Sequence, residues 1–478
     1  MFIIAYPVDE TFMQNSLLKY AQHSPKFTGL HDVLNEVFTD PHVRLALQTD
    51  LIPVGSQAAW NGCPAMPAVV TGSLAVVRRL MGWSYRTLAE EVDMSIGWRW
   101  VCQIYAQPMP NFRTIRDREA LLSSKTLRLI HLKVVHVAQA VGITTAYRLR
   151  LDSSAIETNI HYPTDSSLLS DAARVLSRWL GVARQVVQPK SRQAKICFRR
   201  RHRQARRLAR LIAHQSKSKA KNAGKTSLKW YAQLLHLVEQ LIAQVKEVQQ
   251  QLTVFKQAAA QHIREIFDHY LPLVQQVIAQ TRQRVLERKS VPAAEKVVSL
   301  FEPQTDIIVR GKAAPKETEF GHKMWYAEVD GGLITEWRVL TGNPPDEQQV
   351  IPSVRHHRRL FGRAPREVSG DRGLHSPKNE RLVCRLGVRR VSLPKPGGKS
   401  KSRQRQEHQM WFRAAQRFRN GIEGRISQLR RARGLDRCLN HGQAGLERWV
   451  GWGIIANNIA VIVMKLTQWR MSLAEALC

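Results

Sequence analysis

Apolar residues recur at three- and four-residue spacing through most of the first 145 residues, which predicts an all-helical N-terminal region. The stretch 73–82 has this period and stops at a glycine. A further helix is expected after Ser84, a residue type that favours helix N-caps, and another over 96–105 beyond a turn at 93–95. Two short helices across a tight turn fit a DNA-reading helix-turn-helix or a purely structural hairpin, and the pattern leaves both open.

The spacing of apolar residues changes to two in other parts of the chain. Residues 146–152 alternate apolar and polar positions, which predicts a strand with Asp152 at its C-terminal end. After Pro303 the same alternation predicts further strands, with a hairpin turn at Asp330-Gly331-Gly332. These strands are expected at 306–310, 324–329, 333–340, 366–371 and 388–393, with helices at 346–361, 376–386 and 406–433.

A long stretch of helical periodicity separates the first predicted strand from the others. It is interrupted at Pro272 and is typical of an insertion into an α/β core. The sequence therefore predicts an N-terminal helical domain for DNA binding or dimerisation at 1–145, the first part of the core at 146–170, a basic helical insertion at 171–300, and the rest of the core with C-terminal helices at 301–478.

The charge of the chain indicates an anionic partner. Its 478 residues include 73 Lys or Arg and only 38 Asp or Glu, a formal net charge of +35. Residues 188–225 hold fourteen Lys or Arg and no acid, which favours contact with phosphate groups over a solvated surface of mixed sign. Nucleic acid is the expected partner, ahead of a ribosome-like structural role or an anionic membrane surface.

Neither the cysteines nor the apolar segments predict another class of protein. The six cysteines are widely spaced and form no CxxC pair, so we expect no zinc ribbon, iron–sulfur cluster or disulfide scaffold. The N-terminus is a poor signal peptide. Residues 449–466 are apolar, but Asn457 and Asn458 lie among them, so we expect a buried core helix rather than a membrane span. A cytoplasmic, nucleoid-associated protein is the expectation.

Three acids carry the candidate chemistry. Asp152 and Asp371 each close a predicted strand, and Glu423 lies in a predicted helix that is otherwise rich in arginine. Strand-end carboxylates can converge at one edge of an α/β sheet, and a helix packed on that sheet can supply the third. Such a cluster would bind two Mg²⁺ or Mn²⁺ ions, which together support phosphoryl transfer.

The segments around these acids resemble the DDE transposases of bacterial insertion sequences. The similar stretches are 149–159 (LRLDSSAIETN), 368–375 (VSGDRGLH) and 418–426 (FRNGIEGRI). One branch of this family carries the signature Tyr-x2-Arg-x3-Glu-x6-Lys. Arg419 and Glu423 match its centre, whereas Gln416 stands at the tyrosine position and Arg430 at the lysine position.

The resemblance implies an RNase H-like catalytic core, a mixed sheet flanked by helices, with Asp152, Asp371 and Glu423 as catalytic metal ligands. It also implies an enzyme that cuts DNA at the ends of a mobile element and joins them to target DNA. Pairing two DNA ends favours a homodimer or a larger assembly on DNA. A nuclease of the same fold that does not join strands, and a non-catalytic DNA-binding protein or degenerate transposase, stay open as alternatives.

Several side chains outside the acids are expected to touch DNA. In the insertion these are the arginines of the densest basic run, and in the N-terminal region a residue of the second short helix. His356 and His357 are expected to be exposed near phosphate, and Trp325, Trp337 and Trp449 to lie in the core. The predicted DNA contacts are Arg99, Arg199, Arg200, Arg201, Arg203, Lys399, Lys401, Arg419 and Arg430, with Trp411 stacking on an unpaired base.

Overall fold

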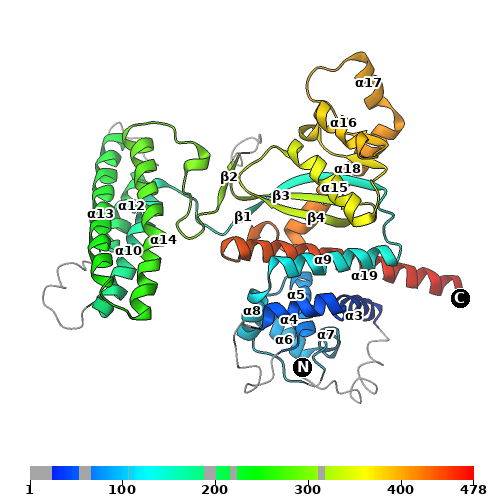
Figure 1. Ribbon diagram of the computed structural model, residues 1–478, viewed down its shortest axis with the longest axis horizontal. Coiled ribbons are helices and arrows are strands. Elements are labelled where there is room, and N and C mark those ends of the chain that lie inside the picture. Colours follow the sequence, from blue (N-terminus) through cyan, green and yellow to red (C-terminus); the bar gives the residue numbers. More distant parts are fainter. Residues whose placement is uncertain are drawn as a thin grey trace. The chain divides into compact units, whose positions relative to one another are not determined.

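The computed structural model describes residues 24–52, 66–105, 107–187, 201–215, 223–309 and 318–477. The chain forms two compact units (Figure 1). Unit 1 combines Met1–Glu157 with His322–Cys478, and unit 2 is the intervening segment Thr158–Gly321. The fold is mixed α/β, with one mixed sheet flanked by helices.

The N-terminal part of unit 1 is helical, as the periodicity predicts. Its helices share one hydrophobic core with the sheet and with the C-terminal helix α19 (Gly442–Leu477), so 1–145 is not a separate compact unit. Gly82 ends α5 in the left-handed conformation, and the Ser84 hydroxyl caps α6 by accepting a hydrogen bond from the Thr87 N–H. The helices are α3 (Pro25–Phe38), α4 (Pro41–Leu51), α5 (Ala68–Met81), α6 (Tyr85–Met94), α7 (Ile96–Val101), α8 (Phe112–Leu121) and α9 (Ser124–Ala140).

The second helix of the predicted helix-turn-helix is shorter than expected. It ends at Val101 instead of 105, because Gln103 and Tyr105 have positive φ angles of 57° and 47°, which no helix accepts. Most of the helix is buried, including Trp98 and Trp100. The structure therefore favours the alternative in which this helix is a packing element.

The sheet places its central strands in a fixed order. Hydrogen-bonded neighbours run β2-β3-β1-β5-β6, with β4 beside β3 and β7 beside β1. The β3–β4 hairpin turns at Gly331 and Gly332, both with positive φ, as the sequence predicts. The strands are β1 (Arg148–Thr158), β2 (Asp306–Val309), β3 (Thr318–Val329), β4 (Leu333–Leu340), β5 (Glu367–Ser369), β6 (Arg390–Ser392) and β7 (Arg437–Cys438).

Asp152 lies in the middle of β1, and the prediction that it ends the strand is wrong. The strand continues to Thr158, and its second half packs too many consecutive residues into the core for a period of two to be visible. β1 and β5 are parallel, with Arg150 opposite Ser369. Asp152 lies two residues after Arg150, and Asp371 lies two residues after Ser369. Because the two strands are parallel, both acids lie on the same side of this register position.

The helices that follow the sheet strands lie close to their predicted positions. A 3-10 turn at Asp346–Gln349 precedes α15 (Val350–Phe361), and α16 spans Pro377–Arg385. The predicted helix 406–433 is two helices, α17 (Lys401–His408) and α18 (Met410–Arg433), separated by the extended residue Gln409. The helix therefore begins at 401, five residues before the predicted start.

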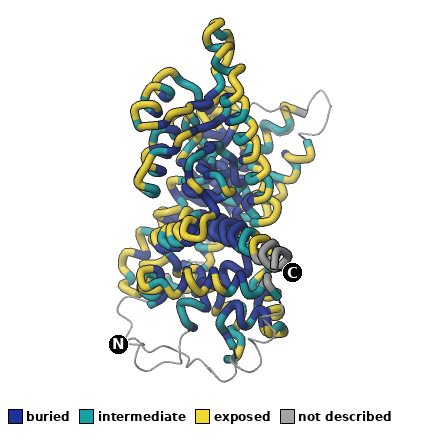
Figure 2. Tube along the Cα trace, turned by 90° about the vertical axis from the view of Figure 1, so that its right-hand side faces the viewer, coloured by how far each residue is buried: buried dark blue, intermediate teal, exposed yellow. Residues whose placement is uncertain are grey.

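α19 is a core helix of unit 1. Among the described residues it is the one helix long and apolar enough to cross a membrane, and 72% of its most apolar window is buried in the protein. It packs against α3, α5 and α9, and its residues 449–459 are all buried, part of the interior drawn dark blue in Figure 2. Asn458, fully buried, donates to the Ile334 carbonyl and accepts from the Ile334 N–H, which satisfies the amide inside the core.

Unit 2 is a helical bundle with a core of its own (Figure 1). Pro272 lies inside a helix and does not interrupt it, contrary to the prediction. The unit also contains β2 and the first residues of β3, which pair with each other, so it extends beyond the predicted insertion at both ends. Its helices are α10 (Asp165–Val187), α12 (His202–Gln215), α13 (Ala223–Leu252) and α14 (Ala258–Thr281).

Candidate functional site

Two carboxylates form the centre of the candidate site. Asp152 is positioned by β1 and Asp371 by the turn that follows β5, and both strands run in the same direction. The Asp152 side chain is 13% exposed, and its carboxylate accepts the Ser153 N–H at 2.8 Å. Oδ1 of Asp371 is buried without a hydrogen-bond partner. A buried acceptor of this kind is costly unless it receives a ligand, so it marks a place where a cation fits.

An arginine side chain bridges the third predicted acid, Glu423, and Asp152. Arg419 of α18 donates to Asp152 at 3.1 Å and, from its other terminal nitrogen, to Glu423 at 2.6 Å. The Glu423 side chain is 62% exposed. α18 thus brings Glu423 to the site as predicted, but a guanidinium lies between it and Asp152.

A fourth acid, Asp346, also belongs to the site, although the sequence indicates only a turn or helix-cap residue there. It accepts the Ser153 hydroxyl at 2.9 Å and pairs with Lys323 at 2.9 Å. In the sequence, Asp346 is distinguished only by lying in an acidic pair just before a helix. Such pairs are too common at helix starts to identify a functional site.

Burial raises the pKa of Asp152 to about 6, and the negative charges of Asp371 and Asp346 act in the same direction. Arg419 and the Ser153 N–H oppose this shift but do not cancel it. Clustered carboxylates with a raised pKa are a common feature of cation sites and catalytic sites.

The fit of these residues to a divalent cation is partial. Asp152 and Asp371 offer hard oxygen donors on adjacent strands, the type that Mg²⁺ prefers. However, no group of three or more Asp, Glu, His or Cys side chains in the described part of the chain is arranged as a metal site. Glu423 would have to leave Arg419 to become a ligand, so only the aspartate pair fits as it lies.

We expect cation binding at this pair to weaken as the pH falls through about 6. Only the ionised Asp152 carboxylate binds a cation, and its raised pKa places the loss near pH 6 instead of near pH 4. Below that value the affinity should fall by about tenfold per pH unit. Calorimetric titration of Mn²⁺ into the protein at pH 5 and pH 7 measures the change. A pH-independent affinity would show that Asp152 is not a ligand.

A buried ion pair behind the site joins β1, β3 and α18. Arg150 donates to Glu328 at 2.6 and 2.9 Å and to the Phe418 carbonyl at 2.5 Å, and Glu328 is fully buried. A Cβ atom at Gly421 would lie 2.3 Å from Arg150, so only glycine allows this approach of α18 to the strand. The pair therefore ties α18 to β1 and β3, and no local pattern in the sequence indicates it.

Gln416, which stands at the tyrosine position of the family signature, fixes the turn that carries Asp371. Its amide nitrogen donates to the Ser392 carbonyl at 2.9 Å, the Ser392 hydroxyl at 2.8 Å and the Gly370 carbonyl at 3.3 Å. These bonds join the ends of β5 and β6 to α18. Gln416 is therefore a positioning residue for Asp371.

A cavity of about 640 Å³ opens beside Asp371. Its walls come from the Asp371 turn, the loop after β6 and one face of α18. Arg372, Arg413 and Arg417 line it and are exposed, and none of them pairs with a carboxylate in the described part of the chain. Two acids, Asp371 and Glu407, also line the cavity, but the three exposed guanidiniums suit a phosphate-bearing ligand.

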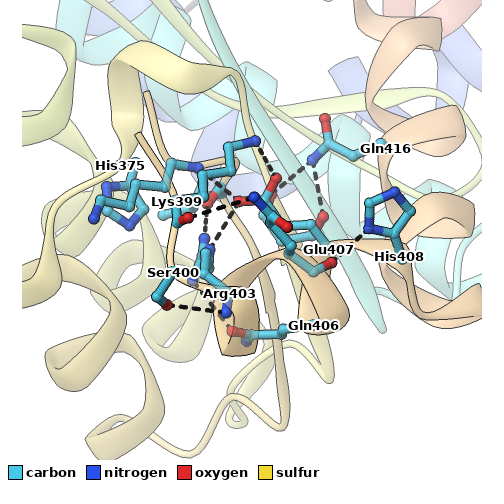
Figure 3. Close-up of polar contacts among 12 residues, drawn as sticks. His375, Lys399, Ser400, Arg403, Gln406, Glu407, His408 and Gln416 are labelled. Carbon is cyan, nitrogen blue, oxygen red and sulfur yellow. Dashed lines mark hydrogen bonds and ion pairs between the residues drawn. The ribbon is translucent and has the colours of Figure 1, made fainter. Parts of the chain in front are cut away.

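One wall of this cavity is held by a second ion cluster (Figure 3). Glu407 accepts hydrogen bonds from Lys399 at 2.5 Å, Arg403 at 2.8 Å and the Lys395 N–H at 3.0 Å. Burial alone would raise the pKa of Glu407, but these donors lower it to about 2. Lys399, a predicted DNA contact, thus lies at the cavity but is already paired, whereas Lys401 is exposed at the start of α17.

The structure gives Arg99 a structural role and corrects its assignment to base reading. Its guanidinium donates to the Tyr105 carbonyl at 2.9 Å, to Asp93 at 2.6 Å and to the Gln107 carbonyl, and its side chain is 16% exposed. These bonds close the irregular segment after α7. A base edge could not take this guanidinium without breaking them.

Two other predicted contacts lie on α18. Arg430 pairs with Asp436 at 2.8 Å. Trp411 is partly exposed, its ring lies edge-on to Phe412, and its indole N–H donates to Gln409. The prediction that His357 is exposed is wrong: it is 1% exposed, and burial lowers its pKa to about 4. Trp325, Trp337 and Trp449 are buried, as predicted.

The basic run of unit 2 forms an amphipathic helix where it is described. Ala205, Leu208 and Ile212 of α12 are buried in the bundle. Arg199 and Arg200 lie outside the described residues. The opposite face of α12 carries exposed arginines, none of which pairs with an acid in the described part of the chain, namely Arg203, Arg206, Arg207 and Arg210.

The geometry thus comprises an aspartate pair on neighbouring parallel strands, an arginine-linked glutamate on α18, and an arginine-lined cavity beside them. We compared the chain with protein-family models, with curated proteins and with solved structures. No family model, curated protein or solved structure matches it.

Proposed function

We propose that the protein is a DDE-type transposase that cuts DNA at the ends of a mobile element and joins them to target DNA. The observation that carries the proposal is the placement of Asp152 and Asp371 two residues beyond the same parallel pair, with Arg419 and Glu423 of α18 beside them. These are the residues at which the sequence resembles that family. The mixed sheet flanked by helices is compatible with the RNase H-like core that the resemblance implies.

In this proposal the acids of the site would bind a cation and the arginines would bind DNA phosphates. Asp152 and Asp371 would bind Mg²⁺ or Mn²⁺, which activates a hydroxyl nucleophile and stabilises the leaving oxygen. Arg419 would release Glu423 towards the cation and turn to a phosphate oxygen. Arg372, Arg413 and Arg417 would hold the neighbouring phosphates in the cavity.

This function implies DNA as the partner, an assembly of at least two copies on paired element ends, and a place of action at the nucleoid. The net charge of +35 supports association with a polyanion. The basic face of α12 supports a backbone contact in unit 2, since arginines without carboxylate partners are free to neutralise phosphates.

The decisive experiment uses DNA that carries the sequences flanking the gene. The full chain is incubated with this DNA, a supercoiled target and Mg²⁺, and both cleaved ends and joined products are measured. Joined products support the transposase. Cleavage without joining would favour the nuclease of the same fold, and specific binding with neither product would favour the non-catalytic protein.

We expect the basic face of α12 to contact the DNA backbone and not the bases. Each phosphate neutralised contributes about 0.9 to the slope of log affinity against log salt concentration. Replacing the four exposed arginines of α12 by Gln should therefore flatten that slope by about 3.6 if each neutralises one phosphate, and weaken specific and non-specific binding alike. The affinity for element-end DNA and for unrelated DNA is measured between low and moderate salt.

The matched control replaces Lys246 and Lys256, two exposed cations of unit 2 outside α12, by Gln. We expect this variant to keep the original slope. A change in slope about half that of the α12 variant, in proportion to two charges removed instead of four, would mean that general charge, and not the face of α12, governs binding.

A further inference from the structure

A second cavity, of about 940 Å³, lies in unit 1 away from the acids. Its walls come from α5, α6 and α8 on one side and from the end of α18, the segment around β7 and the start of α19 on the other. None of the residues that line it belongs to the aspartate site. Its lining includes six arginines and only two acids, Glu119 and Asp436.

The floor of this cavity holds two buried arginines, Arg78 and Arg79, and one buried carboxylate, Glu119. Arg78 makes a two-point ion pair with Glu119, at 2.7 and 3.2 Å. Arg79 is 4% exposed and donates to the Trp449 carbonyl at 2.8 Å, but its Nε has no partner. Arg79 pairs with no carboxylate in the described part of the chain. A buried, uncompensated guanidinium is costly, so the cavity favours an anionic occupant.

The lowered pKa of Arg79 also indicates that an anion would be stabilised in the cavity. Burial lowers its pKa to about 9, and the neighbouring charge of Arg78 adds to the effect. A bound anion would reverse this effect, since it stabilises the charged guanidinium.

The remaining wall of the cavity is aromatic. Trp83 is half-buried at the rim, Tyr85 lies under the Arg78 guanidinium at 4.3 Å, and Trp449 lies under Arg79 at 3.9 Å. Leu439 is 56% exposed beside them. Flat apolar side chains next to arginines suit a ligand that carries both an aromatic ring and a negative group.

We propose that this cavity binds one nucleotide with an unpaired base, its phosphate on the arginines and its base against the half-buried Trp83 at the rim. An acidic protein segment would satisfy the charge, but it would leave the aromatic wall without a matching surface. The base of a nucleotide stacks on tryptophan whatever its identity. The ligand is a free nucleotide or a nucleotide turned out of a DNA strand.

The position of the cavity on α18 connects it to the aspartate site. Arg433, which lines the cavity, follows Glu423 by ten residues on the same helix, a distance of about 15 Å along the helix axis. A DNA strand whose phosphodiester lies at Asp152 could therefore place a nearby unpaired nucleotide in the cavity. This link to DNA rests on the proposed function, whereas nucleotide binding itself does not.

The test measures binding of deoxyadenosine 5′-monophosphate to the full chain by calorimetry, without divalent metal, so that cleavage plays no part. Arg116, at the cavity rim on α8, is replaced by Glu. Arg113 lies on the same helix but does not line the cavity, and its replacement by Glu is the matched control with the same change of charge.

We expect the mononucleotide to bind the original protein about tenfold more tightly than inorganic phosphate, because stacking adds to the anion contact. Arg116→Glu should weaken mononucleotide binding by about tenfold, and Arg113→Glu should leave it unchanged. Trp83→Leu should weaken mononucleotide binding but not phosphate binding. Thermal unfolding of each variant checks that it is folded.

Equal binding of phosphate and mononucleotide would overturn the nucleotide assignment, and equal effects of the Arg116 and Arg113 variants would overturn the cavity as the site. A second arm uses a duplex with 2-aminopurine opposite a gap. A fluorescence change that Arg116→Glu removes would identify the DNA strand as the source, and its absence alongside mononucleotide binding would identify the free nucleotide. Loss of strand cleavage in the aspartate variants tests the proposed function separately.

Discussion

Replacing Asp152 by Asn is expected to lower DNA strand cleavage by on the order of a thousandfold while leaving DNA affinity nearly unchanged. The amide has almost the same shape as the carboxylate, but it supplies no negative charge to a divalent cation. Asp371→Asn should have the same effect, because its buried Oδ1 is the atom without a protein partner. Cleavage of element-end DNA in Mg²⁺, with binding measured in parallel, checks both variants.

Glu423→Gln tests whether this acid joins the aspartates during the reaction. In the structure it is bonded to Arg419, so a large loss of cleavage would mean that it moves to the cation when DNA is bound. The control is Asp117→Asn, which removes a charge from an exposed ion pair on α8 and should cleave normally. A variant of Asp152, Asp371 or Glu423 that cleaves near the normal rate would remove that residue from the site.

Replacing Glu328 by Gln is expected to destabilise unit 1 by about 3–5 kcal/mol, because the change leaves buried arginine charge without its counter-ion. Glu328 is fully buried and accepts hydrogen bonds from Arg150 and, at 3.2 Å, from Arg425. Unfolding by urea, followed by the fluorescence of the core tryptophans, measures the loss. Because the protein has two units, the transitions of unit 1 and unit 2 must be resolved separately.

The control for this variant is Glu157→Gln. Glu157 pairs with Arg437 at 2.7 Å, but both side chains are partly exposed, so the loss should be about 0–1 kcal/mol. If Glu328→Gln were equally mild, water would reach Arg150 in the folded protein. The ion pair would then not be what holds α18 against β1.

Much of the sheet was predictable because short runs rich in β-branched and aromatic residues are bounded by turn residues such as Asp330-Gly331-Gly332. The strand predicted at 333–340 is β4 to the residue, and the helix predicted at 376–386 lies at Pro377–Arg385. β1 was truncated in the prediction because a central strand is covered on both faces, so its second half loses the period of two. The prediction of Asp152 as a site residue therefore rests on a reason that was partly wrong, because the residue does not end its strand.

The side chains that the sequence misplaced are those whose environment depends on distant segments. In the sequence, Arg99 occupies a position typical of a base-reading helix. In the structure, the segment after α7 folds against it, and its guanidinium donates to the Tyr105 and Gln107 carbonyls. His357 looks like one of an exposed basic pair until its helix packs on the sheet. Asp346 and Arg150 join the site through partners far away in the chain, and no local pattern encodes such contacts.

The insertion of unit 2 within the sheet has a consequence for how the chain folds. β1 pairs with β3 and β5, but the whole segment Thr158–Gly321 is synthesised between them. Contacts between residues so distant in sequence are slow to form, since the loop must close before any pairing is gained. The helices of unit 2 come from one uninterrupted segment and pack into a core of their own, so this unit should fold first. Once folded, unit 2 would shorten the flexible loop that must close between β1 and β3. These two strands could then pair before Asp152 and Asp371 are brought together.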